Sequence, residues 1–337
     1  MADTGDKTFG KWSAVIAGTG SALPEKLLTN DDLAQIVDTN DEWITARTGI
    51  KQRHIASDEE TTVTLATDAS RKALEAAGVD ASDVDMIIVG TITPEMVFPA
   101  TACFVQKELG ASKASAFDVT AACSGFLYAL SIGTEFIRSG NYKNILVIGA
   151  ETLSRITNYK DRGSCILFGD GAGAVVLQRS EKPNTGVLCN KLGSDGNGWT
   201  SLNCQAYGSR YPADKPLEDE SMMYMHINGR EVYQLAVRSI VETVQGCLDE
   251  ASLTASDIKK FIPHQMNARI IESVAKRMDF TDEQIFINID KIGNTSAASI
   301  PIALDECYRA GEIQPGDAIV LVAFGAGLTW GGSVIRF

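Results

Sequence analysis

The stretch that decides the fold is Phe117–Gly140, which reads FDVTAACSGFLYALSIGTEFIRSG. An apolar segment ending near Val119 predicts a short strand, and the small residues after it predict a tight turn with Cys123 at the head of a helix. Because residues 126–132 are apolar almost all round, we expect that helix to be buried. The helix dipole and the free N–H groups favour a thiolate, which predicts a pKa for Cys123 below the free value of about 8.5. Cys123 is therefore a candidate nucleophile, although buried free cysteines usually only pack.

Length and composition are those of an ordinary globular enzyme. The chain has 337 residues, of which 45% are hydrophobic and 22% charged, and its length alone favours about two domains. No run of about 18 apolar residues occurs, and the polar first ten residues lack a signal-peptide core, so we expect neither a membrane span nor a leader.

Cysteine usage and charge narrow the class of partner. The seven cysteines lie far apart without a C-x-x-C pair, and the chain has three histidines, which argues against a zinc site and a disulfide framework. This usage favours a reducing, cytoplasmic compartment. The net charge of −13 disfavours nucleic acid as a partner. Any anionic partner must then bind a local basic patch.

An internal repeat organises the chain. Residues 74–84, LEAAGVDASDV, resemble residues 248–258, LDEASLTASDI, which lie 174 positions later. The predicted strand 145–149 matches residues 319–323 at the same offset, whereas segments near the ends of two predicted helices match at an offset of 171. We therefore expect two fused, βαβ-rich copies that pack about a pseudo-twofold axis.

The expected fold class is α/β, with an N-terminal half over residues 1–180 and a C-terminal half over residues 181–337. When the two copies are aligned with an offset of 171 residues, Cys123 aligns with Asn294. With an offset of 174 residues, the end of a predicted strand in the first half aligns with His264. These positions follow predicted strands, where α/β folds place their sites. A pseudo-twofold axis would bring the loops of both halves to one cleft, so we expect Cys123 to face His264 and Asn294.

Cysteine with histidine and asparagine permits two chemistries. In papain-like hydrolysis, histidine pairs with cysteine and asparagine orients the histidine. In acyl transfer followed by carbon–carbon bond formation, cysteine holds an acyl thioester, and histidine and asparagine donate hydrogen bonds to the enolate oxygen formed by decarboxylation. Residue order alone does not separate the two.

Local motifs favour the second chemistry, because they resemble the β-ketoacyl-acyl carrier protein synthase III family from about Ala14 to Phe337. The matching segments are TAACSGF at Cys123, PHQMNARI at His264, GNTSAAS at Asn294, DEWITARTGI at 41–50, FPATAC at 98–103, DRGSCILFGDGAGA at 161–174 and the tail FGAGLTWGGSVIRF. The resemblance implies a thiolase-like fold of five layers, αβαβα, and a homodimer that initiates type II fatty acid synthesis.

The implied reaction condenses acetyl-CoA, or another short acyl-CoA, with malonyl-acyl carrier protein to give 3-oxoacyl-acyl carrier protein, CoA and carbon dioxide. Cys123 would be the acylated nucleophile, with His264 and Asn294 stabilising the decarboxylation transition state. The backbone N–H groups of Cys123 and Ala326 would form the oxyanion hole. Relatives often have glycine where Ala326 stands, but a backbone donor does not require glycine. No metal or other cofactor, nucleic acid or membrane is implied, since acyl-CoA is a substrate.

The resemblance also assigns binding residues. CoA would be bound by an indole and two guanidinium groups, which suit a purine and phosphates: Trp43, Arg47 and Arg162. The basic patch for acidic acyl carrier protein would be formed by cations at i, i+7 and i+8 on the predicted helix after His264: Arg269, Lys276 and Arg277. On spacing alone these three could equally be an ordinary solvated helix face. The acyl pocket would be lined by Thr91, Leu153 and Phe168, with Phe98 reaching in from the partner subunit.

The acyl substrate and the pathway stay open. A bulky Phe98 favours short primers, but the long segment 193–221 is compatible with branched or longer acyl groups. A same-fold alternative is a condensing enzyme of polyketide, quinolone or olefin pathways, and an alternative of another class is a thioester hydrolase.

Overall fold

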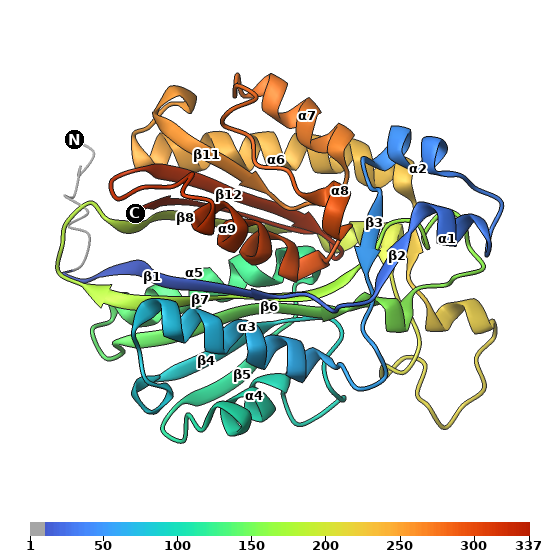
Figure 1. Cartoon of the computed structure of the whole chain (residues 1–337), viewed down its shortest axis with the longest axis horizontal. Helices are drawn as coiled ribbons and strands as arrows, with labels where there is room; N and C mark the ends of the chain where they lie inside the picture. Colours follow the sequence, from blue (N-terminus) through green and yellow to red (C-terminus); the bar gives the residue numbers. More distant parts are fainter. Residues whose placement is uncertain (1–10) are drawn as a thin grey trace.

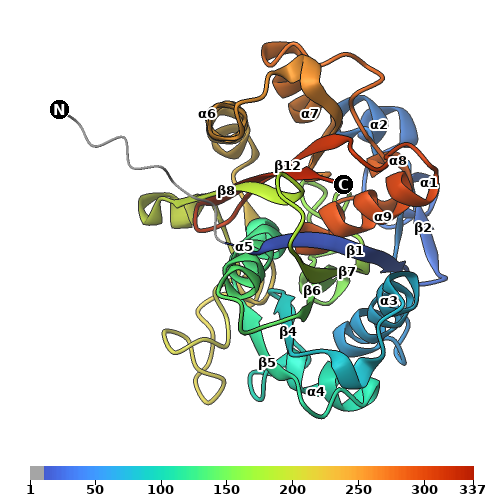
Figure 2. The ribbon, with the colours of Figure 1, turned by 90° about the vertical axis from the view of Figure 1, so that its left-hand side faces the viewer.

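The computed structural model describes residues 11–337, apart from the side chain of Arg230. Helices and sheets alternate in space as helix, sheet, helix, sheet, helix (Figures 1 and 2). The middle layer consists of α5 (Gly125–Arg138) and α9 (Ser299–Arg309), which Figure 2 shows between the two large sheets. Within the described residues, every helix is too short or too polar to cross a bilayer.

The first sheet has the strand order β1-β7-β6-β4-β5. Its strands are β1 (Ser13–Ala22), β4 (Met86–Gly90), β5 (Ser115–Val119), β6 (Asn144–Thr152) and β7 (Asp170–Ser180). β4 is parallel to β5 and β6, whereas β7 is antiparallel to β6 and β1. β4 reads MIIVG and is buried throughout, as expected for a parallel strand with helices over both faces.

The second sheet repeats this plan with the strand order β11-β12-β13-β8. Its strands are β8 (Gly186–Ser194), β11 (Ile258–Pro263), β12 (Ala318–Gly325) and β13 (Thr329–Arg336). β11 and β12 are parallel, and β13 is antiparallel to both β12 and β8. The parallel strands of both sheets therefore end in loops that can carry functional side chains.

The outer layers are amphipathic helices. α3 (Thr62–Ala77) and α4 (Thr101–Leu109) cover the first sheet, and α6 (Gly229–Ala251) and α7 (Ala268–Arg277) cover the second (Figure 2). α3 begins at a capping box between Thr61 and Thr64 and ends at Gly78, whose φ of 62° closes the helix in the left-handed conformation.

Shorter elements join these layers. They are β2 (Leu27–Thr29), α1 (Asn30–Ala34), α2 (Asp41–Thr48), β3 (Gln52–His54), β9 (Leu202–Asn203), β10 (His226–Ile227) and α8 (Ile289–Ile292), with 3₁₀ turns at Ala81–Asp83, Ala122–Ser124, Leu153–Ile156, Gly196–Ser201, Glu220–Met223, Ala255–Asp257 and Ser296–Ala298. The antiparallel pair of β2 and β3 is stabilised by Arg53, a fully buried side chain that donates to the carbonyl oxygens of Leu28 and Ile166.

The two halves contain corresponding helices and strands. Their alignment shows that one pairing of residues expected from the sequence is wrong. β6 begins at residue 144 and β12 at 318, and α5 begins at 125 and α9 at 299, so the offset is 174 for both of these pairs. Ala122 and Ser296 occupy the same place, with φ values of 47° and 48°. Cys123 therefore corresponds to Ala297 and not to Asn294. The offset of 171 arises because α9 has 11 residues and α5 has 14, a shortening that lies after the loop carrying Asn294.

Candidate active site

Cys123 lies where the two halves meet. It sits in the 3₁₀ turn between β5 and α5, preceded by Ala122 with a φ of 47°, a conformation that L-residues hold only where the surroundings enforce it. The end of β12 packs directly against this turn: a Cβ added to Gly325 would lie 2.7 Å from the Cys123 backbone nitrogen. Glycine is required at position 325 because the two backbones approach so closely.

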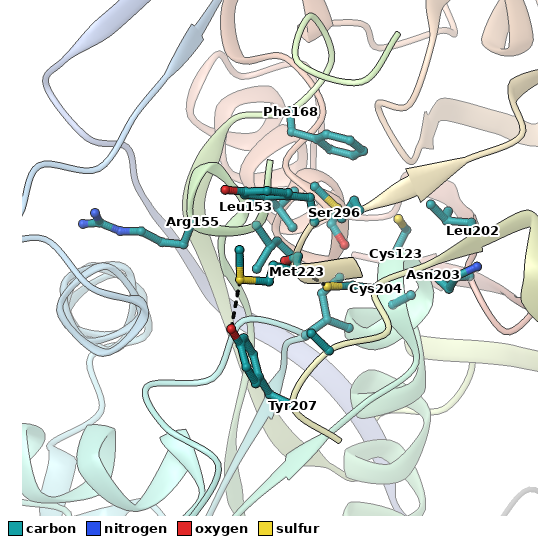
Figure 3. A pocket seen from close by; sticks show the side chains of 17 residues that line it. Cys123, Leu153, Arg155, Phe168, Leu202, Asn203, Cys204, Tyr207, Met223 and Ser296 are labelled. Atoms are coloured by element: carbon teal, nitrogen blue, oxygen red, sulfur yellow. Dashed lines mark hydrogen bonds between the residues drawn. The ribbon is translucent and has the colours of Figure 1, made fainter. Parts of the chain in front are cut away.

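Two cavities meet at the Cys123 side chain. The larger has a volume of about 550 Å³ and contains Cys123, Ser296 and Ala326 in its wall (Figure 3). The narrower has a volume of about 140 Å³ and is lined by Cys123 together with His264 and Asn294. All three side chains are at least nine-tenths buried. The structure thus brings the three predicted catalytic residues to one chamber, as the duplication indicates.

Neighbouring residues orient the imidazole of His264. Its Nδ1 lies 2.5 Å from the hydroxyl oxygen of Ser299, and that oxygen also accepts the backbone N–H of Gln265 at 3.2 Å. We assign the Ser299 hydroxyl as the donor to Nδ1, the arrangement in which the neutral ring keeps its own proton on the other nitrogen. Nε2 then carries the ring proton and is the free donor.

The Asn294 carboxamide is oriented in the same way. Its Oδ1 accepts the backbone N–H of Ser296 at 2.9 Å, which leaves the Nδ2 group as the free donor. His264 and Asn294 therefore each offer one N–H donor beside the sulfur. Two convergent donors suit an oxygen on which negative charge develops.

The charge states differ from those expected for a thiolate site. Burial raises the pKa of the Cys123 thiol to about 12; the nearby charge of Glu151 adds to the rise, and a hydrogen bond with Ser296 opposes it. Burial lowers the pKa of His264 to about 3. The expectation of a lowered Cys123 pKa was wrong, because the desolvation of a buried sulfur outweighs the helix dipole. The resting pair is a thiol and a neutral imidazole.

The residues expected to form the oxyanion hole lie together. Ala326 follows β12 and shares the wall of the larger cavity with Cys123. Ala326 does not adopt a positive φ, so its side chain costs no backbone strain.

The three residues expected to bind CoA also form one cluster. The guanidinium carbons of Arg47 and Arg162 lie 4.4 Å and 5.0 Å from the centroid of the Trp43 ring. The backbone carbonyl of Arg47 accepts a hydrogen bond from the side chain of Asn267 at 3.0 Å, and Asn267 lines the narrow cavity. Asn267 therefore connects this cluster to the chamber that holds Cys123.

α7 presents the expected basic residues to solvent. Ile270, Ile271, Val274 and Ala275 are buried against the second sheet, whereas the cations are exposed: Arg269, Lys276 and Arg277. In the described part of the chain, none of these cations forms an ion pair with a carboxylate. Their charges are thus available to an external partner.

Only two of the four residues expected in the acyl pocket line the larger cavity. Leu153 and Phe168 line the larger cavity (Figure 3), but Thr91 does not, because its hydroxyl bonds to Glu151 at 3.3 Å and its neighbour Ile92 lines the cavity instead. Phe98 is 81% exposed, so the expectation that it enters a partner's pocket stays a prediction.

Sequence reasoning connected the segment 193–221 with the choice of acyl group but named none of its residues for the pocket, and it missed residues 223–225 and Glu151. The segment after β8 contributes a wall of the larger cavity: Leu202, Asn203, Cys204, Ala206, Tyr207, Met223, Tyr224 and Met225. Glu151, at the end of β6, is fully buried near Cys123. An acidic residue directly after the apolar run of a fully buried strand is the signal that could have identified Glu151.

Known proteins resemble this chain over nearly its whole length. Residues 117–196 match the family described as 3-oxoacyl-[acyl-carrier-protein] synthase III, and residues 248–337 match the C-terminal part of that family. The β-ketoacyl-[acyl-carrier-protein] synthase III of Caldanaerobacter subterraneus subsp. tengcongensis is 53% identical, over 97% of this chain and 98% of its own length.

Two solved structures are similar in fold as well. The 3-oxoacyl-[acyl-carrier-protein] synthase III of Aquifex aeolicus VF5 is 46% identical with a TM-score of 0.90, covering 96% of this chain and all (100%) of its own. The priming β-ketosynthase of the R1128 polyketide biosynthetic pathway is 34% identical with a TM-score of 0.91, covering 99% of this chain and 98% of its own. The chain therefore belongs to the β-ketoacyl-[acyl-carrier-protein] synthase III family and has its thiolase-like fold.

Proposed function

We propose that this chain is a 3-oxoacyl-acyl carrier protein synthase III, which condenses a short acyl-CoA such as acetyl-CoA with malonyl-acyl carrier protein and so initiates type II fatty acid synthesis. The observation that carries this proposal is the chamber in which Cys123 meets the free N–H donors of His264 and Asn294. Its steps require no metal or other cofactor, since the chain's own groups supply the chemistry.

In the first step, the sulfur of Cys123 attacks the thioester carbon of acyl-CoA. The backbone N–H groups of Cys123 and Ala326 stabilise the oxyanion, and collapse of the intermediate releases CoA and leaves an acyl-cysteine. The position of Ala326 in the same cavity wall as Cys123 supports this role.

In the second step, malonyl-acyl carrier protein replaces CoA in the narrow cavity. Loss of carbon dioxide places negative charge on the thioester oxygen, which accepts the Nε2–H of His264 and the Nδ2–H of Asn294. The resulting carbanion attacks the acyl carbon on Cys123 and expels the sulfur. Donors fixed in a buried site need no reorganisation as this charge develops, and one such donor is worth about 10²–10³ in rate.

The charge states favour condensation over hydrolysis. A papain-like hydrolase relies on a histidine that accepts the cysteine proton. Here burial lowers the pKa of His264 to about 3, and its Nδ1 is already bonded to Ser299. A neutral imidazole with a free N–H is a poor base in this site, but it is a suitable donor to an enolate oxygen.

The surface residues support the choice of substrates. We assign CoA binding to Trp43, Arg47 and Arg162, since their cluster is linked to the narrow cavity through Asn267. Docking of the acidic carrier protein is assigned to three exposed cations that have no carboxylate partners in the described residues: Arg269, Lys276 and Arg277.

Assembly and location complete the proposal. Val97 and Phe98 are 86% and 81% exposed, and neighbouring apolar side chains of this size are consistent with a homodimer that covers them. The cysteines at positions 103, 123, 165, 189, 204, 247 and 307 are all free thiols, which is consistent with the reducing cytoplasm.

Intact-mass spectrometry tests the nucleophile. Incubation with acetyl-CoA should add one acetyl group to the wild-type chain and none to Cys123→Ser, with Cys103→Ser, a free cysteine outside both cavities, as a matched control that keeps the adduct. Acetylation that persists in Cys123→Ser would refute the assignment. A panel of straight and branched acyl-CoA primers with malonyl-acyl carrier protein then determines which acyl groups the larger cavity accepts.

A further inference from the structure

Thr329 links the two segments that are expected to form the oxyanion hole. It is the first residue of β13, and its hydroxyl oxygen lies 2.8 Å from the carbonyl oxygen of Ala121 and 3.0 Å from that of Ala326. Carbonyl oxygens only accept hydrogen bonds, so the single hydroxyl proton of Thr329 is shared between them. One side chain of the second half therefore holds both the segment that carries Cys123 and the segment that carries Ala326.

The carbonyl of Ala121 belongs to the turn that presents the nucleophile. It accepts the backbone N–H of Ser124 at 3.1 Å, the bond that closes the 3₁₀ turn around Cys123, and it also accepts the Thr329 hydroxyl. A carbonyl oxygen has two lone pairs, and both have a donor here. The peptide group of Ala121 is therefore held from two sides, by its own turn and by β13.

The short connection between β12 and β13 carries Ala326. Gly325 at the end of β12 pairs with Thr329 at the start of β13, and Leu328 exchanges two backbone hydrogen bonds with Asp195, at 2.7 and 2.9 Å. Within this fixed connection, the Thr329 hydroxyl binds the Ala326 carbonyl. The N–H of Ala326 has no acceptor among the described residues, so it is available to a ligand in the larger cavity.

The two segments are in direct contact, so a small displacement would change the spacing of their N–H groups. A Cβ added to Gly325 would lie 2.7 Å from the backbone nitrogen of Cys123 and 3.1 Å from its Cβ. Thr329 is itself anchored on both sides, because it pairs with Gly325 of β12 and with Ser194 of β8. A hydroxyl on a paired strand is a rigid point of attachment for both segments.

We propose that Thr329 is a positioning residue of the oxyanion hole. The inference rests on the proposed acylation of Cys123, in which the backbone N–H groups of Cys123 and Ala326 stabilise the oxyanion. The Thr329 hydroxyl sets the spacing of the two segments, so that both N–H groups reach one oxygen atom. Thr329 lines neither cavity, so it acts through the backbone and not by contact with the acyl group.

The expected effect follows from the narrow range over which oxyanion donors act. They must lie about 2.7–3.1 Å from the position of the charged oxygen, and a misplacement of about 1 Å can cost about 10²-fold in rate. Thr329→Val keeps the shape of the side chain but leaves the carbonyls of Ala121 and Ala326 facing a methyl group. We expect the acetylation of Cys123 at saturating acetyl-CoA to slow about 10- to 100-fold, with KM for acetyl-CoA unchanged.

Alkylation of Cys123 by iodoacetamide separates this role from a general effect on the site. Acetyl transfer passes through a tetrahedral oxyanion, whereas alkylation displaces iodide from a saturated carbon and needs no oxyanion hole. Intact mass follows both reactions for the wild-type chain, Thr329→Val and Thr329→Ser. We expect Thr329→Val to be alkylated at the wild-type rate although it is acetylated slowly. Thr329→Ser keeps the hydroxyl and should recover most of the rate of acetylation.

Ser333→Ala is a matched control on the same strand. Ser333 is buried, its hydroxyl donates to the carbonyl oxygen of Cys189 at 3.1 Å, and it lies outside both cavities. This variant should keep the wild-type rate in both reactions. Thermal melting confirms that each variant is folded, and Thr329→Ala carries the test if Thr329→Val does not fold.

The results that oppose the inference are distinct from those that oppose the proposed function. Acetylation of Thr329→Val at the wild-type rate would overturn the inference, and so would an equal loss of acetylation and alkylation, which would indicate a change in access to the sulfur. Thr329→Ser that is as slow as Thr329→Val would also overturn it, because the hydroxyl would then not be the cause. A wild-type chain that is alkylated but not acetylated at Cys123 would overturn the proposed function, and this inference with it.

Discussion

The sharpest test of the active site separates the two chemical steps. His264→Ala and Asn294→Ala each remove one N–H donor from the narrow cavity, and neither removes the sulfur or the backbone donors of Cys123 and Ala326. Acylation should therefore proceed, whereas decarboxylation of malonyl-acyl carrier protein should fail. The physical reason is that these two donors serve an oxygen that becomes charged only when carbon dioxide leaves.

The expected magnitude follows from the geometry. Loss of one donor fixed in a buried site costs about 10²–10³ in rate, or about 2.7–4 kcal/mol. Both donors act on one oxygen, so the double variant should lose less than the product of the single losses. Since burial lowers the pKa of His264 to about 3, its neutral form persists at all higher pH values. Protonation of His264 should therefore not lower the rate of decarboxylation anywhere between pH 5 and 8.

The assay uses a preformed acetyl-enzyme. Intact mass measures the rate of acetylation by acetyl-CoA, and release of labelled carbon dioxide from malonyl-acyl carrier protein measures the second step. Asn288→Ala is a matched control, since it deletes a buried carboxamide that bonds to Glu306 and lies outside both cavities. If both active-site variants lose acetylation as strongly as decarboxylation, a hydrolase-like Cys–His pair would be favoured and the reasoning refuted.

Further predictions concern docking, pH and the core. Arg269→Glu with Lys276→Glu should raise KM for malonyl-acyl carrier protein about 10-fold or more at low salt and leave acetylation by acetyl-CoA unchanged; equal loss in both assays would exclude docking on α7. The pKa of Glu151 is about 7 in the folded chain and about 4.5 in the unfolded chain. Between these pH values the folded state binds more protons than the unfolded state, so the free energy of unfolding falls as pH rises. Glu151→Gln should therefore gain up to about 3 kcal/mol relative to wild type between pH 5 and 8 in urea unfolding, and a constant difference would contradict the raised pKa. Arg53→Met should cost about 3 kcal/mol or more in the same measurement, since it leaves three acceptors without a donor, two of them buried and one part-buried. A change below about 0.5 kcal/mol would show that water replaces the guanidinium.

Local patterns in the sequence were sufficient for the elements on either side of Cys123 and for the choice of the three side chains that line the narrow cavity. The strand that ends near Val119 and the helix that follows Cys123 are present, and the repeat predicts that His264 and Asn294 lie in the half opposite Cys123. These inferences succeed because caps, periodicity and strand ends depend on neighbours in the chain.

Finer placement depended on contacts that no local pattern carries. Thr91 bonds to Glu151 and leaves the cavity wall to Ile92, a difference of one residue along the chain. The correspondence of Cys123 with Ala297 became clear only when the shortening of α9 was located. The placement of Thr91 and the alignment of Cys123 both depend on how segments pack together and not on the residue types within one segment.

The sequence by itself determined the family, the duplicated α/β plan and the three side chains of the chamber. Only the tertiary structure decided their protonation, which leaves Cys123 a thiol and His264 neutral. It alone placed Ser296 against Glu151, 145 positions away in the chain. The physical reason is that a pKa is set by desolvation and by partners in space, and both exist only after distant segments have packed together.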